Sequence, residues 1–201
     1  MSCVAIIPAR GGSTRIPRKN AKLFHGKPII AYSITAAQDS GLFDQIIVST
    51  DDGEIAEIAR ECGAHAHLRD AALCADHVGT QFVTACVLRE FPEHDYACCI
   101  YATAPLMSAA DLSAGRRALL SDATVSHVIS VGYPPLSDAA QFYWSRAHAL
   151  LVGIEYFDAR TRVVKIARER VCDINTPEDW AKAEAMYQEL MAMEWLVRPA
   201  A

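Results

Sequence analysis

The sequence predicts an α/β sandwich built on a mostly parallel sheet. Apolar runs typical of buried strands alternate with helix-like segments along most of the 201 residues. A glycine-rich, basic segment follows the first of these runs. Because ligands of such sheets bind at the carboxyl ends of the strands, we look for chemistry in the loops that follow them.

The first two elements show how each one is inferred. Val4 to Ile7 is a short apolar run that ends in Pro8, which predicts a buried strand followed by a loop. From Pro28 to Ser40 apolar residues recur with helical spacing, Pro28 suits the first helical position, and Gly41 suits the end. The same reasoning predicts, in chain order, a strand at Gln45 to Thr50, a helix from Asp51 or Asp52 to about Cys62, a strand at Ala64 to Leu68, a helix at Thr80 to Phe91, a strand at Tyr96 to Tyr101, a helix at Ala109 to Leu120, strands at His127 to Val131, Gln141 to Trp144 and Val163 to Ile166, and a closing helix at Thr176 to Met193.

Length and composition indicate one compact domain, because 201 residues with 52% hydrophobic content suffice for one well-filled core. No apolar stretch approaches the ~18 to 20 residues that span a bilayer, and no secretory signal is recognisable, so we expect a soluble, cytoplasmic protein. The seven cysteines are scattered without a C-x-x-C pair, which predicts reduced, inert thiols and no structural metal. The adjacent Cys98 and Cys99 should face opposite sides of a strand.

The net charge of −5 argues against a nucleic-acid or membrane surface, but the charge is unevenly distributed. No acidic residue precedes Asp39, whereas six cations do: Arg10, Arg15, Arg18, Lys19, Lys22 and Lys27. A local cationic patch on an acidic protein suits a single bound anion better than a polyanion.

The loop after the first strand reads PARGGSTRIPRKN over residues 8–20. Two glycines allow the backbone to approach a ligand and to turn N–H groups toward one point, as an oxyanion-rich phosphate requires. Cations and hydrogen-bonding side chains accompany them, and the candidate phosphate-binding residues are Arg10, Gly11, Gly12, Ser13, Lys19 and Asn20. We therefore predict that the segment from Arg10 to Lys22 holds the triphosphate of a nucleotide.

Two common phosphate-binding motifs are absent from this region. In a Walker A motif a glycine would stand at Ala21, before Gly26 and Lys27, and a serine or threonine would replace Pro28. A Gly-x-Gly-x-x-Gly pattern does not follow the strand either. The sequence thus disfavours a P-loop NTPase and a dinucleotide-dependent dehydrogenase.

From about residue 4 to 187, with one gap, the sequence resembles the acylneuraminate cytidylyltransferase family. The resemblance rests on residues 8–20, Leu23, Gly26-Lys27-Pro28, Ala31-Tyr32-Ser33-Ile34 and Ser49-Thr50-Asp51-Asp52. The segments 15–20, 79–80 and 138–144 are most similar to the pseudaminic acid branch. The resemblance implies a three-layer α/β/α Rossmann-like nucleotidyltransferase fold over a single domain, residues 1–201. It also implies an enzyme that condenses CTP with a nine-carbon 2-keto acid sugar, pseudaminic acid first, and releases pyrophosphate.

The resemblance further implies roles for individual residues. It implies nucleotide contacts for Ala9, Arg10, Gly11, Gly12, Ser13, Lys19, Asn20, Arg69, Asp76 and Thr80. It implies sugar contacts for Tyr101, Thr103 and Gln141, and Mg²⁺ ligands at Asp173 and Asn175. Arg10, Lys19 and Asp173 are the expected catalytic residues, which would offset charge while the sugar's anomeric hydroxyl attacks the α-phosphate in line. No general base emerges from the sequence.

The sequence departs from the family pattern at several positions. Asp70 and Ala102 replace prolines, and Asn175 replaces one of two aspartates, which removes one negative charge from a site for a hard dication. Related sequences carry several tens of additional residues between Pro135 and Leu136. In the sialic acid members that insertion builds the dimer interface, so a homodimer is expected for the family although this chain lacks the segment.

Two other interpretations remain compatible with the sequence. A sialic acid or Kdo acceptor is the alternative within the enzyme class. A homologue that binds CTP without transferring it is the alternative outside that class, because the insertion is missing and because Ala102 and Asn175 depart from the pattern.

Overall fold

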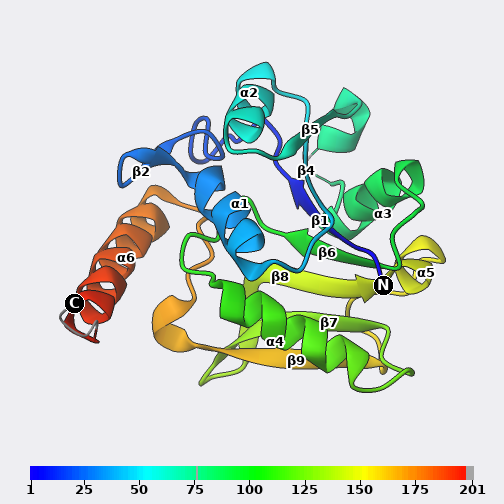
Figure 1. Ribbon diagram of the computed structural model, residues 1–201. Helices are drawn as coiled ribbons and strands as arrows, with labels where there is room; N and C mark the ends of the chain where they lie inside the picture. Colours follow the sequence, from blue (N-terminus) through cyan, green and yellow to red (C-terminus); the bar gives the residue numbers. More distant parts are fainter. Residues whose placement is uncertain (76, 198–201) are drawn as a thin grey trace.

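The computed structural model describes residues 1–75 and 77–197, which form a seven-stranded sheet with helices on both faces (Figure 1). The strands lie in the order β5-β4-β1-β6-β8-β7-β9. Their bounds in that order are His65–Leu68, Gln45–Thr50, Cys3–Pro8, Tyr96–Ile100, Ser137–Arg146, His127–Tyr133 and Thr161–Ala167. β8 runs antiparallel to both its neighbours, and the other described pairings in this sheet are parallel. The predicted α/β sandwich with a mostly parallel sheet is confirmed.

Two helical layers cover this sheet, as the α/β/α arrangement requires. α1 (Ile29–Ser40), α2 (Gly53–Glu61) and α4 (Ala109–Leu120) contribute to one core, and α3 (Thr80–Glu90) and α5 (Ala147–Leu151) contribute to the core on the opposite face. In Figure 1, α1 and α4 lie in front of the strands. Two short 3-10 turns, η1 (Ala71–Cys74) and η2 (Arg168–Arg170), complete the connections.

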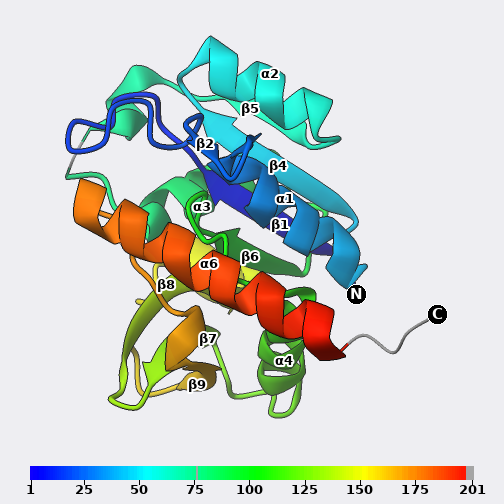
Figure 2. The same cartoon turned by 90° about the vertical axis from the view of Figure 1, so that its left-hand side faces the viewer.

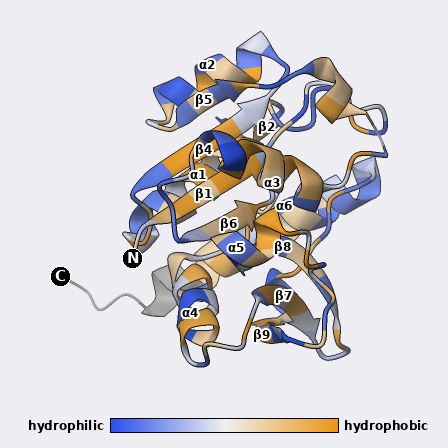
Figure 3. Cartoon of the chain, turned by 90° about the vertical axis from the view of Figure 1, so that its right-hand side faces the viewer, coloured by the Kyte–Doolittle hydropathy of each residue, from blue (hydrophilic) through white to orange (hydrophobic). Residues whose placement is uncertain are grey.

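Alternation along the buried strands separates the two cores. In β1, Cys3, Ala5 and Ile7 belong to the core with α1, whereas Val4 and Ile6 belong to the core with α3. This follows because successive side chains of a strand point to opposite faces. Figure 3 shows hydrophobic residues concentrated on the central strands. The strands are therefore apolar on both faces, as expected for a parallel sheet between two helical layers.

Cys98 and Cys99 divide between the same two cores, which confirms that they face opposite sides of β6. Both thiols are fully buried, and burial raises the pKa of Cys99 to about 11. The seven cysteines are free thiols. Within residues 1–75 and 77–197, no group of three or more His, Cys, Asp or Glu residues could hold a metal ion.

The structure differs from the sequence prediction most clearly at β8 and at Pro28, and it adds the unpredicted short helix α5. β8 extends from Ser137 to Arg146, well beyond the predicted 141–144, because it pairs antiparallel with β7 as far as the tight connection at residues 134–136. Pro28 does not begin the helix: its backbone is extended, with ψ of 133°, and it pairs with Leu23 in the short hairpin of β2 (Leu23–Phe24) and β3 (Lys27–Pro28).

The closing helix α6 (Pro177–Val197) packs against Phe24 of this hairpin and Ile29 of α1. Figure 2 shows it crossing the viewer's side of the molecule. Trp180 and Ala183 of α6 share a third cluster with Phe24, and the partly buried Tyr187 packs against it. None of the described helices is long and apolar enough to cross a membrane.

Candidate active site

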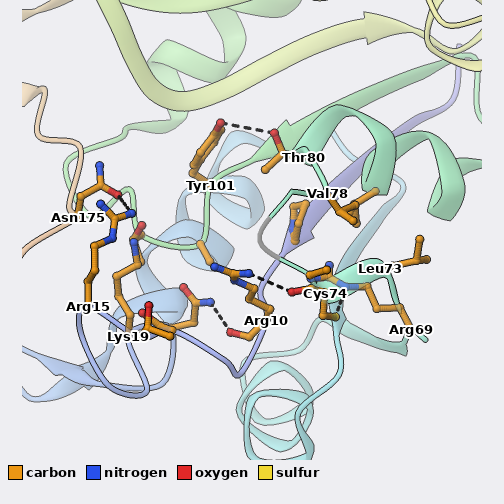
Figure 4. Close-up of a pocket in the computed structure, with 18 residues that line it drawn as sticks. Arg10, Arg15, Lys19, Arg69, Leu73, Cys74, Val78, Thr80, Tyr101 and Asn175 are labelled. Carbon is orange, nitrogen blue, oxygen red and sulfur yellow. Dashed lines mark hydrogen bonds between the residues drawn. The ribbon is translucent and has the colours of Figure 1, made fainter. Parts of the chain in front are cut away.

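A cavity of about 340 Å³ opens at the carboxyl ends of β1, β5 and β6. Its walls come from the loop after β1, the segment after β5, the start of α3, the segment after β6 and the approach to α6 (Figure 4). They are Pro8, Arg10, Ser13, Thr14, Arg15, Lys19, Asn20, Arg69, Leu73, Cys74, Ala75, Val78, Thr80, Val83, Tyr101, Ala102, Thr103 and Asn175. β1 lies where the strand order reverses, between β4 and β6, which is the usual ligand site of such sheets.

Four cations are among the described lining residues of this cavity: Arg10, Arg15, Lys19 and Arg69. Figure 4 shows Arg15 and Lys19 beside Asn175, Leu73 and Arg69 on the opposite side, and Arg10 between them. None of the described lining residues is acidic. Burial lowers the pKa of Lys19, the charge of Asp173 partly offsets this, and the charges of Arg15 and Arg10 lower it further. Bringing these cations together is unfavourable without an anion, so the cavity is suited to a polyphosphate.

The other cations of the N-terminal segment have different partners. Arg18 donates to the Asp52 carboxylate at 2.5 Å and pairs with Glu54. The ammonium of Lys22 lies 4.3 Å from the centre of the Trp180 ring, a cation–π contact. Acids that lie more than thirty positions away in the chain thus pair with part of the basic loop, which the sequence alone did not indicate.

The two glycines of the loop are not equivalent, and neither lines the cavity. A Cβ on Gly11 would lie 2.5 Å from Oδ2 of Asp52, whereas one on Gly12 would meet nothing within 4 Å. The Gly11 amide donates to Asp51 at 2.9 Å rather than into the cavity. Ala9 is buried, and its amide donates to the carbonyl of Ser49. Gly11 therefore allows the loop to approach the start of α2 closely.

Three predicted nucleotide residues that line the cavity also make structural contacts. The Arg69 guanidinium donates to the Ser49 carbonyl at 2.9 Å and to the Cys74 sulfur at 2.9 Å. Asn20 donates to the carbonyl of Arg10 at 2.9 Å, and Arg10 donates to the carbonyl of Cys74 at 3.0 Å. These bonds join the loop after β1 to the segment after β5. Asp76 lies outside the described residues.

Tyr101, Thr103 and Thr80 line the cavity on the side of β6 and α3. The hydroxyls of Tyr101 and Thr80 are 3.5 Å apart, and burial raises the pKa of Tyr101, so its phenol keeps its proton and can donate a hydrogen bond. Gln141 does not line the cavity: it is buried, its amide nitrogen donates to the carbonyl of Arg170, and its side-chain oxygen has no partner among the described residues.

Asn175 and Asp173 lie at the entrance to α6. The Asn175 side chain accepts from Arg15 at 3.0 Å and donates to the Asp173 carboxylate at 2.6 Å. Asp173 is exposed and does not line the cavity directly. The ammonium of Lys19 donates to the carbonyl of Ile174 at 2.6 Å. Two residues of the basic loop therefore bond to this distant segment.

A capping box fixes the segment that carries Asn175. The Asp179 carboxylate accepts from the amides of Asn175 and Thr176, at 3.0 and 2.9 Å, and the Asp179 amide donates to the Thr176 hydroxyl. The backbone amides of Asn175 and Thr176 lower the pKa of Asp179. Thr176 and Asp179 thus cap the N-terminus of α6.

Several lining residues were not predicted as site residues: Thr14, Arg15, Leu73, Cys74, Ala75 and Val78. The position of Arg15 in the basic loop indicated a phosphate contact, but nothing in the sequence distinguished it from Arg18. Leu73 and Cys74 belong to the 3-10 turn η1, and Ala75 and Val78 come after it, in a stretch of sequence without clear periodicity.

Comparison with known sequences identifies similar proteins. The profile of the family described as Cytidylyltransferase matches residues 4–133. The pseudaminic acid cytidylyltransferase of Campylobacter jejuni subsp. jejuni is 33% identical over 225 residues, which cover 94% of this chain and 97% of that relative. N-acylneuraminate cytidylyltransferase A of Danio rerio is 41% identical over 103 residues, which cover 51% of this chain and 24% of that relative.

Comparison with solved structures concerns the fold. The structure of CMP:2-keto-3-deoxy-manno-octonic acid synthetase complexed with CTP superposes with a TM-score of 0.78 at 18% identity. The superposition covers 96% of this chain and all of that one. The arrangement of strands and helices is thus shared over nearly the whole chain.

Proposed function

Since this chain belongs to the cytidylyltransferase family, we propose that it condenses CTP with a nine-carbon 2-keto acid sugar, pseudaminic acid first, to give the CMP-sugar and pyrophosphate. The relative that matches along nearly its whole length is named for this acceptor. A sialic acid acceptor is the alternative, supported by the shorter match to the N-acylneuraminate enzyme.

The observation that carries the proposal is the set of cations that line the cavity, in which Arg15 and Lys19 lie on one side and Arg10 lies between them and the opposite side. None of the described lining residues is acidic. A triphosphate placed on that side would bind these charges, while the opposite side, which includes Leu73 and Val78, would receive the less polar base and ribose. Tyr101 and Thr103 would face the acceptor sugar.

Catalysis in this proposal consists mainly of positioning and charge stabilisation. The anomeric hydroxyl of the sugar attacks the α-phosphorus of CTP in line and releases its proton to water, and the bond from the α-phosphorus to the bridging oxygen breaks as pyrophosphate leaves. Arg10 and Lys19 stabilise the negative charge on the phosphates, and the Ser13 hydroxyl adds a hydrogen bond. Asn20 orients Arg10 by donating to its carbonyl at 2.9 Å.

The residues at the entrance to α6 fit a divalent cation. Asp173 and Asn175 offer hard oxygen atoms at neighbouring positions, where the Asn175 amide nitrogen donates to the Asp173 carboxylate. Two protein ligands are few, but Mg²⁺ usually keeps water and substrate phosphate oxygens in its shell. When bound, Mg²⁺ would neutralise phosphate charge and polarise the phosphoryl oxygens.

We also propose that residues 1–201 work as one nucleotidyltransferase domain. Only residues 134–136 connect β7 to β8, so this connection has no room for a segment that reaches a partner subunit. The acceptor site would then be made from this chain's own residues beside β6.

The decisive experiment is a pyrophosphate-release assay with CTP, Mg²⁺ and a set of keto acid sugars. We expect release with pseudaminic acid to exceed that with N-acetylneuraminic acid or Kdo, and CTP to be preferred to UTP. Lys19→Met should abolish the release, whereas Arg60→Ala, which removes an exposed cation of α2, should not affect it. The opposite result is that the protein binds CTP tightly while no sugar raises pyrophosphate release above the rate measured with CTP alone. That result would show a homologue that binds the nucleotide but does not transfer it.

A further inference from the structure

Arg15 occupies a position that the proposed function does not explain. It lines the cavity beside Lys19, but its guanidinium makes a hydrogen bond to the side-chain oxygen of Asn175, at 3.0 Å. That oxygen is also the one that Asn175 would offer to a divalent cation. One atom therefore has two prospective partners, both positively charged.

The orientation of the Asn175 amide is fixed by its two neighbours. Its nitrogen donates to the Asp173 carboxylate at 2.6 Å, while its oxygen accepts from Arg15. The reversed orientation would place the oxygen against a carboxylate and the amide hydrogens against a guanidinium, which is unfavourable on both sides. The capping box of Asp179 holds the backbone of Asn175 in place. Arg15 therefore covers the cation-binding oxygen in the free protein.

The Arg15 guanidinium also has unused binding capacity. It carries five N–H donors, and the bond to Asn175 uses one of them. Arg15 is exposed on a loop, and it is one of the charges that make Lys19 harder to protonate. A phosphate group would offer Arg15 a bidentate partner that bears a full charge, which is stronger than a neutral amide oxygen.

We infer that Arg15 changes its hydrogen-bond partner when the nucleotide binds: it releases the amide oxygen of Asn175 and binds the terminal phosphates instead. Until the nucleotide has arrived, Arg15 therefore keeps a divalent cation away from that oxygen. The inference rests on the proposed function, because it assumes that the cavity receives a triphosphate. Figure 4 shows the side of the cavity concerned, with Arg15, Lys19 and Asn175 together. Arg15 thereby couples the binding of the nucleotide to the binding of the cation.

The test measures the affinity for two ligands, which the variant Arg15→Ala should change in opposite directions. Binding of CTP is measured by calorimetry in EDTA, and binding of Mn²⁺ without nucleotide is measured by electron paramagnetic resonance. Arg15→Ala should weaken CTP binding by about tenfold or more, as expected for a lost charge-assisted bond. The same variant should strengthen Mn²⁺ binding severalfold, because the oxygen is uncovered and a repelling charge is removed. A variant that merely disturbs the loop would weaken both.

Matched variants assign the effects to these residues. Arg60→Ala removes an equal charge far from the cavity and should change neither affinity. Asn175→Ala added to Arg15→Ala should abolish the gain in Mn²⁺ affinity, because the uncovered oxygen is absent. With CMP in place of CTP, the loss caused by Arg15→Ala should nearly disappear, since the terminal phosphates are missing.

The results that overturn the inference are distinct from those that overturn the function. Unchanged CTP affinity in Arg15→Ala, or unchanged or weaker Mn²⁺ affinity, would refute the exchange. Arg15→Met, which removes the charge but keeps much of the side-chain length, provides the same comparison if the alanine variant does not fold. Absence of CTP binding by the parent protein, with and without Mg²⁺, would refute the proposed function itself.

Discussion

Replacing Gly11 by alanine should damage both stability and nucleotide binding, whereas the same change at the next residue should not. A Cβ at Gly11 would lie 2.5 Å from Oδ2, 2.8 Å from Cβ and 3.0 Å from Cγ of Asp52. The Asp52 side chain cannot easily move away, because it caps α2 by accepting from the amides of Glu54 and Ile55 and also binds Arg18. The loop after β1 must therefore shift.

The cost can be estimated from these contacts. Overpacking of this kind costs about 1 to 3 kcal/mol, and loss of the helix cap alone costs about 1 kcal/mol, so we expect a loss of about 2 kcal/mol in the free energy of unfolding. Gly12→Ala should be neutral or gain up to about 1 kcal/mol, since its Cβ meets nothing within 4 Å and the unfolded chain loses freedom.

Urea unfolding followed by circular dichroism gives the two stabilities, and calorimetry with CTP gives the two affinities. Gly11→Ala should bind CTP at least about tenfold more weakly, because Arg10 and Ser13 move with the loop. If Gly11→Ala is as stable as Gly12→Ala and binds CTP as tightly, the close approach to Asp52 does not position the loop.

Three further changes test other parts of the structure. Gly115→Ala should lower the free energy of unfolding by about 1 to 3 kcal/mol in a urea titration, although alanine favours helices, because its Cβ would lie 2.5 Å from Trp144; a stabilised variant would contradict this. Asp111→Asn should cost about 3 kcal/mol near neutral pH by breaking a largely buried pair with Arg170. Burial alone would raise the pKa of Asp111, but bonds from Arg170 and Ser108 lower it overall, so this stabilisation is present above pH 3.8 and is lost as the pH falls through the lower folded value. The free energies of unfolding of the two proteins should therefore converge at low pH, and a difference that stays constant with pH would exclude the linkage. Lys19 has a lowered pKa, so CTP affinity should fall with rising pH before the ordinary lysine value of 10.5 is reached, and Lys19→Met should lose that limb of the profile.

Much of the fold could be predicted because the buried strands appear in the sequence as runs of apolar residues. The division of Cys98 and Cys99 between two cores follows from alternation alone. The length of β8 could not be predicted in this way, since its first residues are exposed and polar and depend on pairing with β7. Pro28 suits a helix start on local grounds, but the pairing with Leu23 places it in a hairpin.

The site was less accessible to prediction from sequence, because similar residues in one loop have different long-range partners. Arg15 and Arg18 are equivalent in composition and charge. Only the folded chain brings Asp52 to Arg18 and Asn175 to Arg15. Likewise, the sequence predicted the same phosphate-binding role for Gly11 and Gly12, but only Gly11 lies in close contact with Asp52.

The bond between Lys19 and the carbonyl of Ile174 joins residues that are 155 positions apart in the chain. A nascent chain that has emerged from the ribosome only as far as β9 would have its sheet but not the last wall of the cavity. The three cations would then lie together without the segment that accepts from two of them. The cavity should therefore be completed late during synthesis, after residue 175 has left the exit tunnel.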